Sequence, residues 1–236
     1  MIRPILFGGN LVGRIAIAPG VEPVDEALVT LVARELSGPK TLAALVDESK
    51  RLADTDGLTG LMNRRAFLQA MTVEVPRAER YDYPLSLLML DVDHFKAIHD
   101  RHGHAVGDRV LTALGAMLGQ ERRASDLVTR WGGEEFILGL TSTDAAGSLV
   151  AGERVRACAE AMDVRTDSGE RVPVTVSVGC ATRHAGEELP VVIDRADRAI
   201  YRAKQTGRNR VLGSEETSEV AAGSGVVPAV GAVLAS

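Results

Sequence analysis

The stretch that decides the fold is Arg130-Trp131-Gly132-Gly133-Glu134-Glu135-Phe136, in which two glycines separate two apolar runs. The runs are Leu127-Val128-Thr129 and Phe136-Ile137-Leu138, both typical of β-strands. Because glycine accepts the positive φ of a tight turn, the pattern predicts a hairpin that reverses at Gly132 and Gly133. The two carboxylates that follow place negative charge at the turn. Taken by itself, the turn would equally fit a hairpin tip exposed to solvent.

Helices and strands alternate on both sides of this hairpin. The patterns predict helices over 66–80, 105–118, 145–162 and 190–204, and strands over 85–90, 172–180 and 210–212. This order favours an α/β (α+β) sandwich, in which helices cover a central, mostly antiparallel sheet related to the ferredoxin-like plan.

The two ends of the chain differ from this central region. Residues 3–18 predict two short strands, and helices are expected over 24–36 and 40–53. We interpret 1–38 as part of a sensory-like or regulatory segment and 39–53 as a connecting helix. The tail over 213–236 is rich in Gly, Ala, Ser, Glu and Val without amphipathic periodicity, so it is expected to be disordered.

Composition narrows the classes of protein that the 236 residues can form. A hydrophobic content of 45% supports a buried core, and the net charge of −5 argues against a nucleic-acid partner. Two cysteines give no disulfide framework. Apolar runs fall short of the roughly 20 residues that span a bilayer, so no membrane span is expected. A cytoplasmic location is predicted.

Asp91 and Asp93 come at the end of an apolar strand. Residues two apart on a strand point to the same face, whereas Val92 between them points into the core. With Glu134 and Glu135 on a neighbouring hairpin, these side chains would form an oxygen-rich site suited to Mg²⁺ or Mn²⁺. Nucleotidyl transfer uses such sites. A helix cap at a solvated strand end is the alternative for the aspartates.

Several motifs together resemble the GGDEF family of diguanylate cyclases over roughly residues 54–212. The matching stretches are 132–136, 91–96, 56–65, 103–104 with 107–108, and 201–204 with 207–209. The resemblance implies the nucleotidyl cyclase palm fold. It also implies an enzyme that condenses two GTP into cyclic di-GMP and two pyrophosphates, with one GTP on each half of a homodimer.

The resemblance assigns a catalytic and metal-binding set by position. Asp91, Glu134 and the carbonyl of Val92 would bind Mg²⁺ or Mn²⁺, and Glu135 would be a further ligand or the base for the 3′-hydroxyl. Neither Gly132 nor Gly133 carries a Cβ that would block a ligand from the backbone.

The resemblance also assigns the phosphate contacts. The backbone at His94 and Phe95, with Lys96, Lys204 and Arg208, would hold the β- and γ-phosphates. Cations at these positions suit a triphosphate that the acidic site would otherwise repel.

The base-binding positions depart from the family pattern. Asp108 matches the carboxylate that accepts hydrogen bonds from guanine, but His99 stands where the family usually has asparagine. An imidazole offers one donor and one acceptor in a different geometry. His99 could donate to guanine, weaken guanine selectivity, or mark a site kept for binding alone. Loss of one buried hydrogen bond would cost about 1–3 kcal/mol.

A second motif lies upstream of the hairpin. Arg123-Ala124-Ser125-Asp126 resembles the Arg-x-x-Asp inhibitory site of the family, and Arg154 falls where a second arginine of that site is often found. The resemblance implies that Arg123, Asp126 and Arg154 bind the product, cyclic di-GMP. An exposed salt bridge would also account for the Arg-x-x-Asp spacing.

Three functions follow from these motifs. The first is a Mg²⁺-dependent, homodimeric, product-inhibited diguanylate cyclase. The alternative is a catalytically weak or inactive receptor for cyclic di-GMP, which His99 favours and the Glu134-Glu135 pair opposes. A cyclase that makes mixed purine dinucleotides rests on His99 and is opposed by Asp108, which would repel adenine N1.

Overall fold

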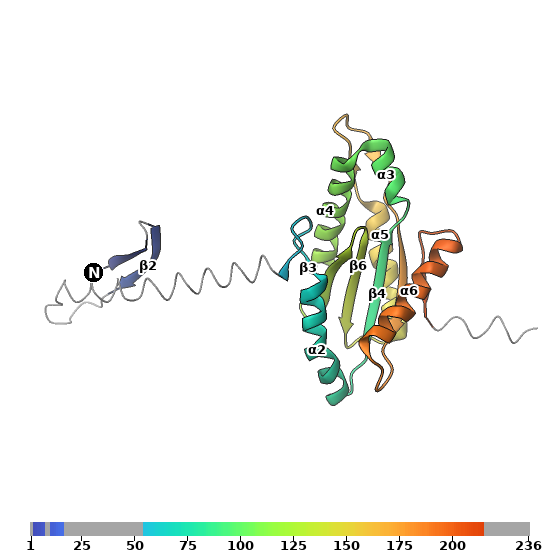
Figure 1. The fold of residues 1–236 in the computed structure, drawn as a ribbon, viewed down its shortest axis with the longest axis horizontal. Helices are drawn as coiled ribbons and strands as arrows, with labels where there is room; N and C mark the ends of the chain where they lie inside the picture. Colours follow the sequence, from blue (N-terminus) through green and yellow to red (C-terminus); the bar gives the residue numbers. More distant parts are fainter. Residues whose placement is uncertain (1, 8–9, 17–53, 215–236) are drawn as a thin grey trace, which may run out of the picture. The chain divides into compact units, whose positions relative to one another are not determined.

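The computed structural model describes residues 2–7, 10–16 and 54–214 (Figure 1). The chain divides into two compact units, 1–55 and 56–236. In the first unit, β1 (Ile2–Phe7) pairs antiparallel with β2 (Asn10–Ala16), which confirms the two strands predicted over 3–18. The helices predicted over 24–36 and 40–53 and the tail from 215 lie outside the described residues.

The second unit is built on a six-stranded sheet with the order β10-β9-β4-β6-β5-β3. The bounds are β3 (Met62–Asn63), β4 (Leu85–Val92), β5 (Leu127–Gly132), β6 (Glu135–Thr141), β9 (Val176–Thr182) and β10 (Val211–Gly213). The four inner strands pair antiparallel, whereas β3 and β10 pair parallel with β5 and β9. The predicted mostly antiparallel sheet is therefore confirmed.

Five helices of the described region pack around this sheet (Figure 1). They are α2 (Arg64–Arg80), α3 (Phe95–His102), α4 (His104–Glu121), α5 (Ala145–Ala161) and α6 (Leu189–Gln205). Four of them match the predicted helices to within about three residues, and α3 was not predicted. In the described part of the chain, no helix is both long and apolar enough to cross a membrane.

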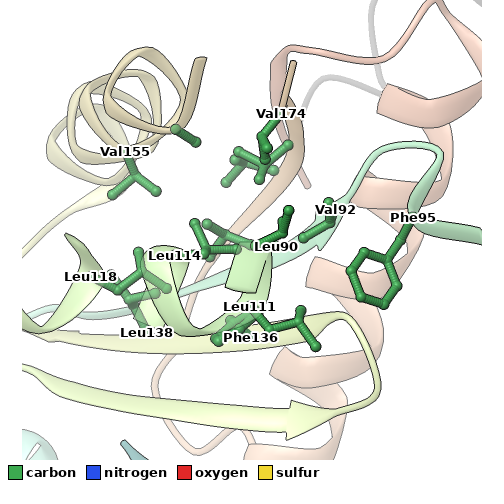
Figure 2. Packing of buried hydrophobic residues seen from close by; sticks show 14 of the residues in the cluster. Leu90, Val92, Phe95, Leu111, Leu114, Leu118, Phe136, Leu138, Val155 and Val174 are labelled. Atoms are coloured by element: carbon green, nitrogen blue, oxygen red, sulfur yellow. The ribbon is translucent and has the colours of Figure 1, made fainter. Parts of the chain in front are cut away.

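All eight residues of β4 are buried because helices pack on both sides of it. Leu88, Leu90 and Val92 face one side, where they pack with side chains of α4 and α5 such as Leu114 and Val155 (Figure 2). Alternate residues of β4 face the other side and pack with α2 and α6. Because side chains alternate along a strand, Asp91 lies on the α2 and α6 side while Val92 enters the core.

The single strand predicted over 172–180 is wrong in its first half. Residues Arg171–Val172 form β8, which pairs with β7 (Val164–Arg165) in a separate two-stranded sheet. Pro173 follows directly and has no backbone N–H to donate to a ladder, so the central strand β9 begins only at Val176. At its other end the sheet extends into the predicted tail, since Gly213 belongs to β10.

Candidate active site

The carboxylates of the predicted metal site meet at one end of the sheet. In the ladder between β4 and β6, Asp91 lies opposite Glu135. The backbone N–H of Val92 donates to the carbonyl of Glu134 at 3.3 Å, so the turn after β5 closes directly over the end of β4. The structure thus brings the adjacent pair Asp91 and Val92 to the adjacent pair Glu134 and Glu135, although more than 40 residues separate the two pairs in the sequence.

Lys204 reaches this cluster from the last turn of α6. Its Nζ lies 2.7 Å from Oδ2 of Asp91. The Asp91 side chain is 9% exposed and that of Lys204 is 33% exposed, so the ion pair is largely shielded from water. The predicted phosphate-binding lysine therefore contacts a predicted metal ligand directly.

Burial and like charges make the ionised carboxylates unfavourable here. Burial raises the pKa of Asp91, Lys204 lowers it in part, and the charges of Glu134 and Asp93 raise it again. Burial also raises the pKa of Glu135, and the nearby charge of Asp91 adds to that increase. Carboxylates that repel one another in a half-buried place are the kind of site that a divalent cation stabilises.

The donor chemistry therefore fits a hard divalent cation such as Mg²⁺ or Mn²⁺. No group of three His, Cys, Asp or Glu side chains among the described residues is close enough to hold an ion as it stands. Lys204 occupies Oδ2 of Asp91, so an ion bound there would compete with the ammonium group.

Asp93 does not join this cluster, contrary to the prediction from the Asp-Val-Asp spacing. Its Oδ1 accepts a hydrogen bond from Ser177 Oγ at 2.7 Å. Its Oδ2 accepts from Thr175 Oγ1 at 2.8 Å and from the N–H of Asn209 at 3.0 Å. Both oxygens are therefore occupied by β9 and by the segment after α6, and the buried Asp93 side chain is a structural anchor.

The Gly132-Gly133 turn is open to an approaching ligand. A Cβ atom at either glycine would have no neighbour within 4 Å, and Gly133 has a φ of +53°. Arg130 fixes the conformation of the turn, because its Nε donates a hydrogen bond to the Gly133 carbonyl at 2.9 Å. Its Nη1 donates to both carboxylate oxygens of Asp56 at 3.2 Å. Neither Arg130 nor Asp56 was assigned a role from the sequence.

The predicted base-binding residues line a cavity of about 250 Å³ beside this turn. Its lining residues are Phe95, Lys96, His99, Asp108, Leu111, Arg130, Gly133 and Glu134. This cavity therefore brings together His99 and Asp108 with Lys96 and Glu134, whereas Glu135 and Lys204 line a separate cavity.

The His99 ring is packed between two other rings in this cavity. Its centroid lies 4.4 Å from that of Phe95 and 4.6 Å from that of His104. Its Nε2 is buried and has no hydrogen-bond partner in the described part of the chain. This atom faces Gly107 of α4, since a Cβ there would lie 2.0 Å from it.

The remaining predicted phosphate contacts surround the same end of the sheet. His94 adopts a left-handed conformation at φ +56°, which begins α3, and Lys96 is exposed on its first turn. Arg208 is exposed after α6. Among the described residues, neither the Lys96 ammonium nor the Arg208 guanidinium has an ion-pair partner.

The predicted inhibitory residues form a second cavity, of about 400 Å³, whose lining includes Arg123, Asp126 and Arg154. Asp126 is buried, and its Oδ2 accepts a hydrogen bond from the backbone N–H of Arg123 at 2.9 Å. Its Oδ1 is buried without a partner in the described region. Arg154 contacts Glu121 at 3.3 Å. This cavity lies beyond the last residues of β6, whereas Glu135 begins that strand.

A family model described as "Diguanylate cyclase, GGDEF domain" matches residues 53–210. The chain belongs to the GGDEF family. Diguanylate cyclase DgcP of Pseudomonas aeruginosa is 37% identical to this GGDEF protein over 186 residues, which are 79% of this chain and 28% of DgcP. Response regulator PleD of Caulobacter vibrioides is 40% identical over 170 residues, which are 71% of this chain and 37% of PleD. The chain thus spans about a third of the length of these relatives.

Solved structures confirm the fold of this GGDEF domain. The GGDEF domain of DgcB from Caulobacter crescentus, in complex with c-di-GMP, has a TM-score of 0.67 and 36% identity, covering 69% of this chain and 96% of that one. Diguanylate cyclase SiaD of Pseudomonas aeruginosa, in complex with its activator SiaC, has a TM-score of 0.68 and 36% identity, covering 79% and 72%. The active GGEEF domain of a diguanylate cyclase from Vibrio cholerae has a TM-score of 0.61 and 31% identity, covering 66% and 98%.

Proposed function

We propose that this GGDEF domain condenses two GTP into cyclic di-GMP and two pyrophosphates. The 3′-hydroxyl of each GTP loses its proton and its oxygen bonds to the α-phosphorus of the other GTP, while the bond from that phosphorus to pyrophosphate breaks. The observation that carries this proposal is the register of Asp91 opposite Glu135, with the Glu134 carbonyl on the N–H of Val92. The reaction needs two GTP held face to face, so the enzyme acts as a homodimer.

Asp91, Glu134 and the Val92 carbonyl hold Mg²⁺ or Mn²⁺ in this proposal, and Glu135 is a further ligand or the base for the 3′-hydroxyl. The cation, when bound, neutralises charge that develops on the α-phosphate and lowers the pKa of the attacking hydroxyl. The raised pKa of Glu135 suits a group that takes up a proton.

Lys96, Lys204 and Arg208 bind the β- and γ-phosphates, which carry most of the negative charge of GTP. The two free cations, Lys96 and Arg208, are available without breaking an existing ion pair among the described residues. Lys204, which pairs with Asp91 at 2.7 Å, would be available to the phosphates if a cation took its place on the Asp91 carboxylate.

His99 and Asp108 bind the guanine base in the cavity beside the turn. The Asp108 carboxylate accepts hydrogen bonds from the N1–H and N2–H of guanine. His99, whose ring also lines the cavity, supplies a further polar contact with the base edge.

Arg123, Asp126 and Arg154 bind cyclic di-GMP in the second cavity and inhibit the enzyme. The unpaired Oδ1 of Asp126 supports this role, because it is an acceptor placed to meet a guanine edge. The arginines supply the charge that phosphodiesters require.

The test is to incubate the purified chain with GTP and Mg²⁺, beside an ATP and GTP mixture, and to identify the nucleotides by chromatography with mass detection. Cyclic di-GMP as the product supports the proposal, whereas mixed dinucleotides would point to relaxed purine selectivity at His99. The Glu134→Gln variant should lose at least 100-fold in turnover and still bind cyclic di-GMP. The same change at the exposed Glu170 is the control and should leave turnover unchanged.

A receptor for cyclic di-GMP is the second candidate, and the substitution of His99 for asparagine favours it. It would be identified by a chain that dimerises and binds cyclic di-GMP but produces no dinucleotide from GTP. In that case Arg123→Ala would abolish the remaining binding, while Glu134→Gln would have no effect.

A further inference from the structure

A chain of polar contacts joins helix α5 to the segment that carries Arg208. The side chain of Asn209 bonds to two residues of α5, because its Oδ1 accepts from Arg156 Nη1 at 2.8 Å and its Nδ2 donates to Glu160 Oε1 at 2.9 Å. Arg156 also pairs with Glu160 at 2.7 Å. Asn209 is thus fixed from one side by a closed triangle of hydrogen bonds.

The backbone of Asn209 is fixed from the other side by the residue that directly follows β4. Its N–H donates to Oδ2 of Asp93 at 3.0 Å. Asp93 is 4% exposed and is held in turn by Thr175 and Ser177 of the β9 segment. Because Asp93 follows Asp91 and Val92 directly, this bond ties the segment after α6 to the strand end that carries the proposed metal ligands.

These contacts hold a strained stretch of backbone. Gly207, Arg208 and Asn209 all have positive φ, of +125°, +60° and +44°. Each residue with a side chain in this region costs on the order of 1 kcal/mol or more, and such conformations persist where the surroundings enforce them. Asn209 makes three hydrogen bonds that can enforce this conformation. The exposed side chain of Arg208 makes no hydrogen bond within the described residues.

We propose that Asn209 is a positioning residue for Arg208. It does not touch the nucleotide. Its bonds to Asp93, Arg156 and Glu160 hold the backbone in the one conformation that projects Arg208 at the β- and γ-phosphates. This inference rests on the proposed function, in which Arg208 binds those phosphates.

The role predicts an effect that depends on the phosphates of the ligand. We would measure the binding of GMP and of the non-cleavable analogue guanosine 5′-(α,β-methylene)triphosphate by calorimetry, with Mg²⁺ present. Asn209→Ala should weaken binding of the analogue about tenfold and leave binding of GMP within twofold, because GMP lacks the two phosphates that Arg208 holds. Asn209→Gly, which accepts positive φ but loses the side-chain bonds, should weaken the analogue similarly.

Measuring Asn209→Ala in a chain that already carries Arg208→Ala distinguishes an effect on the position of Arg208 from a general loss of stability. There, Asn209→Ala should change analogue binding by less than twofold, since the residue that it positions is absent. Tyr83→Phe is the matched control, because it removes the hydrogen bond from the Tyr83 hydroxyl to Glu74 at 2.6 Å, before the start of β4 and at the opposite end of that strand from Asp91. It should change the binding of neither ligand.

Four results would overturn the inference. In the first, Asn209→Ala weakens the binding of GMP as much as that of the analogue. In the second, its effect on analogue binding is the same with and without Arg208→Ala. In the third and fourth, the analogue binds to Asn209→Ala or to Asn209→Gly as tightly as to the unmodified chain. If the unmodified chain bound GMP and the analogue equally, or bound neither, the proposed function of Arg208 would fail as well. A tight wild-type complex that Asn209→Ala leaves unchanged would refute the positioning role while the proposed function stands.

Discussion

Replacing Gly107 by alanine should test the packing of His99 in the proposed base-binding cavity. A Cβ at Gly107 would lie 2.0 Å from both Cδ2 and Nε2 of His99, so the two groups cannot coexist. The α4 backbone is fixed by its own hydrogen bonds, whereas His99 is a side chain that can rotate. We therefore expect the imidazole to leave the cavity in Gly107→Ala.

The magnitude follows from the contacts that His99 would lose. Its ring packs on Phe95 and His104, and each such ring pair contributes about 0.5–1.5 kcal/mol. Alanine in place of glycine stabilises a helix by roughly 0.5–1 kcal/mol. The expected net loss is thus about 0–2.5 kcal/mol in the native background. In a His99→Ala background the same change should stabilise the protein by up to ~1 kcal/mol.

The assay is urea denaturation of the four proteins of this double-mutant cycle, with calorimetric binding of the non-cleavable GTP analogue beside it. We expect a coupling energy of about 1–3 kcal/mol between the two positions, and weaker nucleotide binding in Gly107→Ala. An equal change in the free energy of unfolding on Gly107→Ala in both backgrounds would show that His99 does not lie against Gly107. The proposed base-binding cavity would then have a different lining.

Two further predictions concern stability. Gly179→Ala should cost several kcal/mol or prevent folding, because its Cβ would lie 2.2–2.5 Å from backbone atoms of α6. The same change at Gly139, whose nearest neighbour would be 3.4 Å away, should cost about 1 kcal/mol or less in the same denaturation assay. Burial acts to raise the pKa of Glu187, but hydrogen bonds from Arg195 and a backbone N–H bring it below its usual value of 4.5. A lowered carboxylate pKa stabilises the fold above the unfolded pKa, and this stability is lost as the pH falls through the folded pKa. Glu187→Gln should therefore cost about 1–3 kcal/mol at pH 7 and progressively less below pH ~4, and an equal cost at pH 7 and pH 3 would contradict this linkage.

Local patterns allowed most of the fold to be predicted. The two glycines with strand-like flanks indicated the β5–β6 hairpin, and apolar periodicity indicated four of the five helices. Helix α3 was missed because it has eight residues and two buried apolar side chains, Phe95 and Ile98, which are too few to establish a period. Pro173 was the available sign that the strand over 172–180 is interrupted.

The candidate site was predictable where its residues lie within motifs. The grouping of Asp91, Lys204 and the glutamates followed from the family resemblance, and the structure places them together. The supporting contacts were not predictable, because they join distant parts of the chain. Arg130 and Asp56 are 74 residues apart and Asp93 and Asn209 are 116 apart, so no local pattern reveals them. The Asp-Val-Asp spacing even suggested a different role for Asp93.

The short strands at the two borders of the sheet have a consequence for how copies of this domain can meet. β3 has two residues and β10 has three, so each border of the six-stranded sheet presents very few backbone groups for pairing with another chain. Long free borders are where sheets of neighbouring molecules merge and aggregate. In the homodimer that the proposed function requires, these short borders would protect the two copies from joining sheet to sheet. Under that proposal, side chains and the bound nucleotides would make the contacts between the copies, and such contacts could be reversed once the product has formed.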